Sequence, residues 1–184
     1  MRFLKRWSLT RFPWFLLFVT GVSANAYALV LQNYFNELPC YHCVIDRYYL
    51  YLIALAGLIG FIMPKFTLTR LVACLLFLYA SVMGVLNNIT HLDKIASHQA
   101  NPFSIGSSCP LYFDLLGGLP QKYFPGVFAP LGNCETGGPT VLGLNLVEWT
   151  FVLFIALTVV AALVLISQVF RLPKKNGFSF SMKK

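Results

Sequence analysis

Four long runs without a charged residue constrain this chain more than any other feature of its sequence. They are Phe12–Asn36, Tyr48–Pro64, Leu71–Leu92 and Trp149–Phe170. A helix rises 1.5 Å per residue and the hydrocarbon core of a bilayer is about 30 Å thick, so each run has about the length of one crossing. The shortest, Tyr48–Pro64, can extend through Val44 and Ile45. Because only helices and closed barrels satisfy the backbone in lipid, and the alternation of a barrel strand is absent, the sequence predicts four transmembrane helices.

The composition excludes an ordinary water-soluble domain. Hydrophobic residues make up 58% of the 184 residues and charged residues only 11%, against a usual charged share of roughly 25%. We therefore predict an all-α integral membrane protein, a four-transmembrane-helix bundle that forms a single domain over residues 1–184. The expected spans are approximately 13–32, 45–63, 71–90 and 149–170, separated on the outer side by loops 33–44 and 91–148.

The distribution of charge predicts the orientation of the bundle. The net charge is +8, but no stretch carries the basic stripe of a nucleic-acid-binding face, and we expect no nucleic-acid partner. Most basic residues lie instead in the two tails and one connector: Arg2, Lys5, Arg6, Arg11, Lys65, Arg70, Arg171, Lys174, Lys175, Lys183 and Lys184. The positive-inside rule then places both termini in the cytoplasm. All six acidic residues fall outside or at the outer boundary: Glu37, Asp46, Asp93, Asp114, Glu135 and Glu148.

A cleavable signal peptide is the competing interpretation of the N-terminus. A basic start, an apolar run and the small residues around Ala24–Ala28 resemble one. However, Leu29, Val30 and Leu31 prolong the apolar run beyond the cleavage site, and cleavage would leave three spans with termini on opposite sides. A retained first span is therefore favoured.

One segment of the long outer loop is apolar without being long enough to span. Leu111–Leu119 is interrupted by Asp114, Gly117 and Gly118 and is followed by Pro120. We expect it to lie at the membrane interface as a short amphipathic turn of helix.

Five cysteines carry the chemistry of the sequence. Cys40, Cys43, Cys109 and Cys134 fall in the predicted outer loops, whereas Cys74 lies in an apolar span and is expected to be a packing residue. An outward-facing, oxidising compartment favours disulfides, and four cysteines allow three pairings. A Cys-x-x-Cys disulfide closes too small a loop to add much stability, so such a pair is more often redox-active than structural.

The first two cysteines lie where the second span begins. Pro39 marks the turn into the helix, which would put Cys43 in the first helical turn, where free backbone N–H groups favour a thiolate. Arg47 is four residues further on and would share a helix face with Cys43. An arginine at this depth is costly enough to indicate function. The alternative is that Arg47 only reaches the lipid headgroups.

Other cysteine chemistries fit the spacing less well. A zinc site of four cysteines needs two close pairs, but Cys109 and Cys134 are separated by 24 residues, and we expect no metal. Haem attachment requires a histidine directly after Cys43, where Val44 stands. Purely structural disulfides remain an alternative. Dithiol–disulfide exchange at the membrane is the interpretation that the residues favour.

These motifs resemble one known family. The segment Leu38–Arg47 and the apolar span after it resemble the DsbB family of bacterial inner-membrane thiol oxidases. Further matches are Leu78-Tyr79, His91, the two later cysteines Cys109 and Cys134, and Ile166-Ser167-Gln168. Two features depart from the family pattern: Asp46 stands where glutamate is common, and Tyr41-His42 is an unusual pair between the first two cysteines.

The resemblance implies a protein-disulfide oxidase of the bacterial inner membrane. It would reoxidise DsbA, a soluble periplasmic thiol oxidase, through a loop disulfide Cys109–Cys134, with Cys109 forming the mixed disulfide. Electrons would pass to a second disulfide, Cys40–Cys43, and from Cys43 to a membrane quinone, either ubiquinone or menaquinone. Arg47 would polarise the quinone oxygen, and His91 is a second candidate for the quinone pocket.

Two alternatives to this function remain open at this point. The first is a close relative, DsbI, which serves a dedicated DsbA-like partner. The second is a non-enzymatic membrane protein, a scaffold or a transporter subunit, whose disulfides only hold its loops together.

The predicted orientation can be tested with a topology reporter. Alkaline phosphatase needs periplasmic disulfides to be active, so a fusion after Lys184 should be inactive if the C-terminus is cytoplasmic. A fluorescent protein at the same position should fluoresce. Active phosphatase at residue 184 would overturn the orientation.

Overall fold

The computed structural model describes residues 7–100, 110, 112, 115–132, 134 and 137–169. The four long helices are α2 (Phe12–Tyr34), α3 (Tyr41–Ile62), α4 (Thr67–Ala100) and α7 (Leu146–Val169). The smaller elements all lie between α4 and α7: a 3-10 helix (Leu115–Gly118), α5 (Leu119–Tyr123), α6 (Pro125–Phe128), β1 (Thr140–Val141) and β2 (Leu144–Asn145). Cys109, Asp114, Glu135 and most of the basic tail residues lie outside the described residues.

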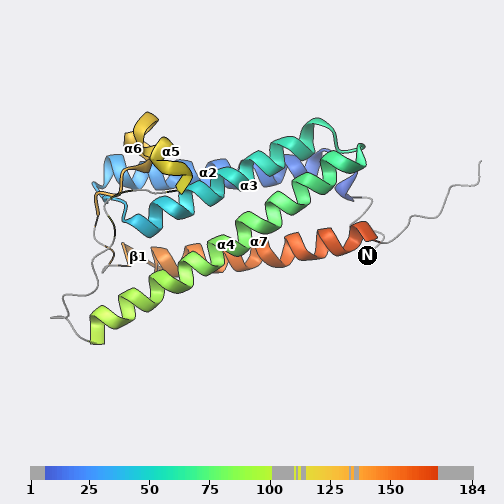
Figure 1. Cartoon of the computed structure of the whole chain (residues 1–184). Coiled ribbons are helices and arrows are strands. Elements are labelled where there is room, and N and C mark those ends of the chain that lie inside the picture. Colours follow the sequence, from blue (N-terminus) through green and yellow to red (C-terminus); the bar gives the residue numbers. More distant parts are fainter. Residues whose placement is uncertain are drawn as a thin grey trace, which may run out of the picture.

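The long helices form an elongated bundle in which chain neighbours pack on one another (Figure 1). Helix α2 packs on α3, α3 on α4, and α4 on α7. The start of α2, the α3–α4 connection and the end of α7 lie at one end of the bundle. Helices α5 and α6 and strand β1 lie at the opposite end, which we call the loop end. Because the start of α2 and the end of α7 lie at the same end, the chain makes an even number of crossings.

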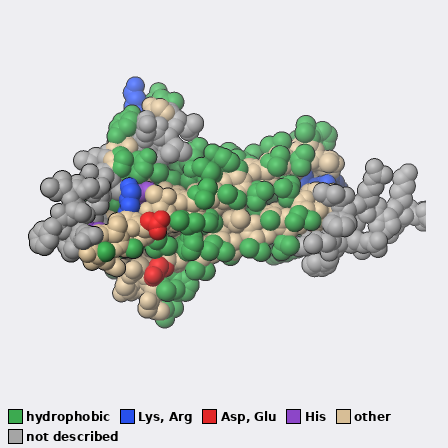
Figure 2. Space-filling model, turned by 60° about the horizontal axis from the view of Figure 1, so that its bottom comes forward, with side chains coloured by type: hydrophobic (Ala, Val, Ile, Leu, Met, Phe, Trp, Pro, Cys, Tyr) green, Lys and Arg blue, Asp and Glu red, His purple; other side chains and the backbone are tan. Residues whose placement is uncertain are grey.

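The prediction of four membrane-spanning helices is confirmed. Each of the four long helices contains a window that is apolar enough and long enough to cross a bilayer. Hydrophobic side chains cover the middle of the bundle, and the acidic side chains seen on this face lie toward one end (Figure 2). Leu55, Leu75 and Val160 are among the apolar residues exposed on the outside. In water this surface would be unfavourable, whereas in lipid it is the expected exterior.

Helix α3 is the most enclosed of the four. More than half of its spanning window (56%) is buried, compared with 22% for α2 and for α7. Its Val44, Ile53 and Ala56 form the main core with Phe77 of α4 and Phe154 of α7. The first turns of α3 carry Cys43 and Arg47, so these side chains lie inside the bundle.

Glycines allow the helices to approach closely. A Cβ at Gly84 of α4 would overlap the ring of Phe154, and a Cβ at Gly60 of α3 would overlap the ring of Trp14. Helices in lipid gain little from the hydrophobic effect, so close packing at small residues is an important source of their association. These two contacts fix α7 against α4 and α2 against α3.

The structure differs from the sequence prediction at the loop end. Helix α4 continues to Ala100, beyond the span predicted to end at residue 90, so His91 and Asp93 are helical. Strands β1 and β2 form a two-residue hairpin that the sequence did not suggest, with positive φ at Leu142 and Gly143. The described part of the segment expected to form a short interfacial helix is a 3-10 turn that leads into α5.

Filling the space at Gly84 should weaken the bundle. In Gly84→Leu the new side chain would push the Phe154 ring away, and overpacking of this kind typically costs about 1–3 kcal/mol. We expect a lower midpoint of thermal unfolding in detergent. The matched control is Gly126→Ala, where a Cβ meets nothing within 4 Å and the midpoint should stay unchanged. Equal midpoints for the two variants would contradict the packing described here.

Candidate functional site

The site begins at the N-terminus of α3. Cys40 is the N-cap residue, with extended backbone (φ −77°, ψ 172°), and its Sγ accepts a hydrogen bond from the backbone N–H of Cys43 at 3.3 Å. From the sequence, the free N–H groups of the first turn were expected to act on Cys43. The sulfur that accepts this N–H is that of Cys40, because the cap residue, and not a residue inside the turn, faces the free donors.

The two sulfur atoms of the Cys-x-x-Cys motif lie together. Cys40 Sγ and Cys43 Sγ are 2.8 Å apart, and both cysteines are free thiols in this structure. A hydrogen bond from the Cys43 thiol lowers the pKa of Cys40 below its ordinary value, although burial acts in the opposite direction. Cys40 is 3% exposed and Cys43 is half-buried. The two sulfur atoms are therefore close enough for disulfide formation, with Cys40 buried and Cys43 partly exposed.

His91 lies against this pair. Its Nε2 is 3.6 Å from Cys40 Sγ, and the ring is fully buried. The His91 ring stacks on that of His42, with ring centroids 5.0 Å apart and an interplanar angle of 19°. His91 reaches this position because α4 continues beyond residue 90, where the predicted span ended. A ring nitrogen at this distance can exchange a proton with the Cys40 thiol.

Arg47 joins three segments of the chain. Its Nη1 donates to Gln32 Oε1 at 2.7 Å and to the carbonyl oxygen of Val127 at 3.0 Å, and its Nη2 donates to the carbonyl oxygen of Ala28 at 3.3 Å. Gln32 Nε2 in turn donates to the carbonyl oxygen of Gly126 at 3.0 Å. Arg47 is 5% exposed, and its Nε has no hydrogen-bond partner among the described residues. These contacts explain how a guanidinium is kept inside the bundle.

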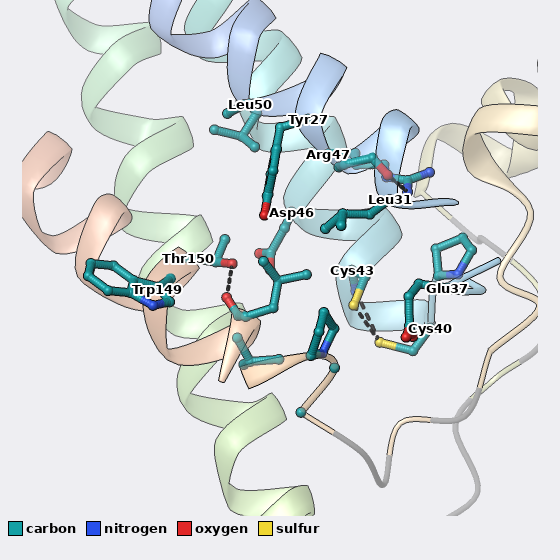
Figure 3. A pocket seen from close by; sticks show the side chains of 18 of the residues that line it. Tyr27, Leu31, Glu37, Cys40, Cys43, Asp46, Arg47, Leu50, Trp149 and Thr150 are labelled. Carbon is teal, nitrogen blue, oxygen red and sulfur yellow. Dashed lines mark hydrogen bonds between the residues drawn. The ribbon is translucent and has the colours of Figure 1, made fainter. Parts of the chain in front are cut away.

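A cavity of about 240 Å³ lies beside the motif, between α2, α3 and the start of α7. Figure 3 shows Cys40, Cys43, Asp46 and Arg47 around it, together with apolar and aromatic side chains. Most of the lining is apolar and includes Ala24, Tyr27, Leu31, Leu50, Val147 and Leu153. His91, which was predicted as a second pocket residue, is not among the lining residues and contacts Cys40 instead.

The loop that carries Cys134 docks directly beside the motif. The backbone N–H groups of Leu131 and Gly132 both donate to the carbonyl oxygen of Pro39, at 3.0 and 2.9 Å. A Cβ at Gly132 would overlap the carbonyl oxygen of Leu38, so only glycine fits this approach. Cys134 is buried and disulfide-bonded. Cys109, its predicted partner, lies outside the described residues.

Comparison with known proteins points to the same dithiol–disulfide chemistry. The family model described as "Disulfide bond formation protein DsbB" matches residues 10–164. A protein of Pasteurella multocida named disulfide bond formation protein B is 36% identical over 177 residues, which cover 96% of this chain and 97% of the relative. The proteins of the same name from Escherichia coli K12 and Haemophilus influenzae Rd are 34% and 33% identical, over 97% and 94% of this chain and 98% and 96% of the relatives.

The chain belongs to the DsbB family. It is a disulfide bond formation protein and a disulfide oxidoreductase, and its four apolar helices make it a multi-pass protein of the bacterial inner membrane. The Sγ atoms of Cys40 and Cys43 and the near ring nitrogen of His91 all lie within 4.8 Å of one another, which fits a redox-active centre of this family.

One part of this DsbB-family site was not predicted from the sequence. Asn87 and Asn88 of α4 both donate side-chain hydrogen bonds to Asp46 Oδ1, at 2.8 and 2.9 Å. Asn87 Oδ1 is also 2.7 Å from His42 Nδ1. Two adjacent asparagines inside an apolar span were the available signal, because polar side chains in a membrane helix are costly and indicate function.

The fifth cysteine should be dispensable in this DsbB-family protein. Cys74 is 1% exposed and packs with Trp14 and Ala73, away from the Cys-x-x-Cys motif. We expect Cys74→Ala to retain nearly full activity in the oxidation of a reduced dithiol protein, while Cys40→Ala should lose it. The check is the rate of thiol loss, with folding confirmed by thermal unfolding. An inactive but folded Cys74→Ala variant would contradict the assignment.

Proposed function

We propose that this protein reoxidises a soluble DsbA-like thiol oxidase of the periplasm and passes the electrons to a membrane quinone. The observation that carries the proposal is that Cys43 and Arg47 line one mostly apolar cavity inside the bundle. A thiol–disulfide pair is thereby in contact with a space that suits a lipid-soluble molecule. Bound there, a quinone would supply the final acceptor for two electrons.

The residues around the cavity fit a quinone. The lining is apolar, as the ring and its substituents require, and Arg47 brings a positive charge. Three of the hydrogen bonds of Arg47 are directed to Gln32, Val127 and Ala28, which leaves Nε–H as a buried donor without a partner among the described residues. A buried donor without an acceptor is unfavourable, and a quinone oxygen would satisfy it. A fixed positive charge at low dielectric also stabilises an oxygen that gains negative charge on reduction.

The electrons would reach Cys40–Cys43 from the second pair. The loop that holds Cys134 is bonded to Pro39, the residue before Cys40. This docking supports exchange between the Cys109–Cys134 disulfide and the Cys40–Cys43 pair, since exchange needs an attacking thiolate within reach of a disulfide sulfur. His91 Nε2, close to Cys40 Sγ, would hold or release the proton of that thiol.

Replacing Cys134 tests the partner. With Cys134→Ser, the Cys109 thiolate can attack the disulfide of the oxidised DsbA-like protein, and no Cys134 thiol is present to displace that protein, so the mixed disulfide should accumulate. Identification of a thioredoxin-like oxidase in the trapped complex is the expected result. A chain that oxidises no dithiol protein and traps none would overturn the proposal.

Replacing Arg47 tests the quinone site. Loss of a charged hydrogen-bond donor typically costs about 1.5–3 kcal/mol, so Arg47→Gln should raise the apparent KM for decylubiquinone by about 10- to 100-fold. Arg47→Lys keeps the charge but not the planar fork and should be partly active. Formation of the Cys109 mixed disulfide should be the same in all three proteins. Normal quinone kinetics in Arg47→Gln would show that the residue only anchors the helix.

A further inference from the structure

A buried polar network lies behind the redox pair, on the side of α3 that faces α4. Asp46, Asn88 and His91 are each at most 6% exposed, and His42 is 5% exposed. Asp46 also lines the cavity and lies three residues after Cys43, on the same face of the helix. A carboxyl group at this position is unfavourable unless it is hydrogen-bonded or has a function.

The two asparagines hold the carboxyl group through one of its oxygens. Asn87 Nδ2 and Asn88 Nδ2 donate to Asp46 Oδ1 at 2.8 and 2.9 Å. Among the described residues, Oδ2 of Asp46 receives no hydrogen bond and no basic side chain forms an ion pair with it. The group is therefore fixed at Oδ1, while its second oxygen is free to exchange a proton.

His42 determines which way the Asn87 amide points. Asn87 Nδ2 donates both to the His42 carbonyl oxygen at 3.0 Å and to Asp46, which turns Asn87 Oδ1 toward His42 Nδ1, 2.7 Å away. An amide oxygen only accepts, so this contact requires the His42 tautomer that carries its proton on Nδ1. A flipped amide would place its NH₂ group against the ring N–H and its oxygen against the carboxylate. The histidine between the two cysteines thus orients Asn87, which in turn positions Asp46.

The reaction proposed for this site requires the movement of protons. When the Cys40–Cys43 dithiol becomes a disulfide, two S–H bonds break, one S–S bond forms and two electrons leave. Reduction of a quinone to its quinol consumes those two electrons and two protons. The cavity beside Cys43 is mostly apolar, so a titratable group in its lining is the candidate for carrying a proton between sulfur and the quinone oxygen.

We propose that Asp46 is this group: its carboxylate accepts the proton of the Cys43 thiol and delivers it to the quinone oxygen that is being reduced. The proton of Cys40 leaves to water at the loop end, and one proton from water completes the quinol. Asn87, Asn88 and His42 are positioning residues that hold the carboxyl group. This inference rests on the proposed function and gives a role to Asp46 and to the His42 of the Tyr41-His42 pair, the two places where the sequence departs from the family pattern.

The test separates binding, thiol exchange and quinone reduction in the full-length protein. Quinone binding is measured with decylubiquinone through quenching of tryptophan fluorescence, since Trp149 lines the cavity. Reduction is measured in a single turnover after the Cys40–Cys43 pair has been reduced. Exchange with a reduced dithiol protein is measured without quinone. Infrared difference spectra between the oxidised and the reduced protein, both without quinone, report the carboxylic acid C=O band of an Asp46 that holds the Cys43 proton.

Asp46→Asn keeps the shape of the side chain but cannot carry a proton. General acid–base catalysis contributes about 10²–10⁴-fold, so we expect at least about a 100-fold slower reduction of decylubiquinone. Binding and thiol exchange should be unchanged, and the infrared band should disappear. Asp46→Glu should recover much of the rate. His42→Phe, which keeps a ring against His91 but loses the donor to Asn87, should give a smaller fall of the same kind.

The control is Asp93→Asn, an exposed carboxyl group on α4, which should leave all four measurements unchanged. An Asp46→Asn variant that reduces decylubiquinone at the wild-type rate would overturn the inference, as would one whose only defect is weaker binding. If Asp46→Asn does not fold, His42→Phe decides: decylubiquinone reduction at the wild-type rate, or a defect in binding alone, would overturn the inference. A wild-type protein that cannot reduce decylubiquinone at all would overturn the proposed function itself, and this inference with it.

Discussion

The need to satisfy polar groups inside an apolar bundle governs the structure around the redox pair. Helix α3 begins within the protein, so the free N–H groups of its first turn need acceptors that the bilayer does not provide. The sulfur of Cys40 accepts one of them. The same residue that caps the helix is thus the buried member of the Cys-x-x-Cys pair, and the helix N-terminus and the dithiol form one structural unit.

The charged side chains that follow on α3 meet the same constraint in two different ways. Arg47 donates from its two Nη atoms to groups of α2 and α6, and so ties the loop end to the membrane helices. Asp46 is satisfied by two amides from α4. Neighbouring residues of opposite charge therefore bind to different helices instead of to each other. The result is a cavity with a positive group and a carboxyl group at separate points of an apolar wall.

Packing in the rest of the bundle makes this arrangement possible. Glycines at the α2–α3 and α4–α7 contacts allow the helices to pack closely, and Gly132 lets the Cys134 loop reach the residues before Cys40. Since lipid offers no hydrophobic force that would press helices together, these close contacts and the buried hydrogen bonds hold the site in place. The exposed apolar side chains elsewhere contribute to insertion into the membrane and not to the site.

The sequence alone determined the four crossings, because long apolar runs without charge are stable as helices in lipid. Residue types and spacing identified the Cys-x-x-Cys motif and Arg47, whereas His91 was indicated only by the resemblance to the DsbB family. The sequence could not show that α4 extends to Ala100, since no breaker or cap marks the predicted end at residue 90. It also could not show which polar groups meet. That Arg47 bonds to Gln32 and Val127, that His91 contacts Cys40, and that Asn87 and Asn88 hold Asp46 depends on which faces of the helices are turned toward each other. Tertiary packing decides those faces, because a polar side chain within an apolar helix finds its partner on another helix, at a distance along the chain that no local pattern records.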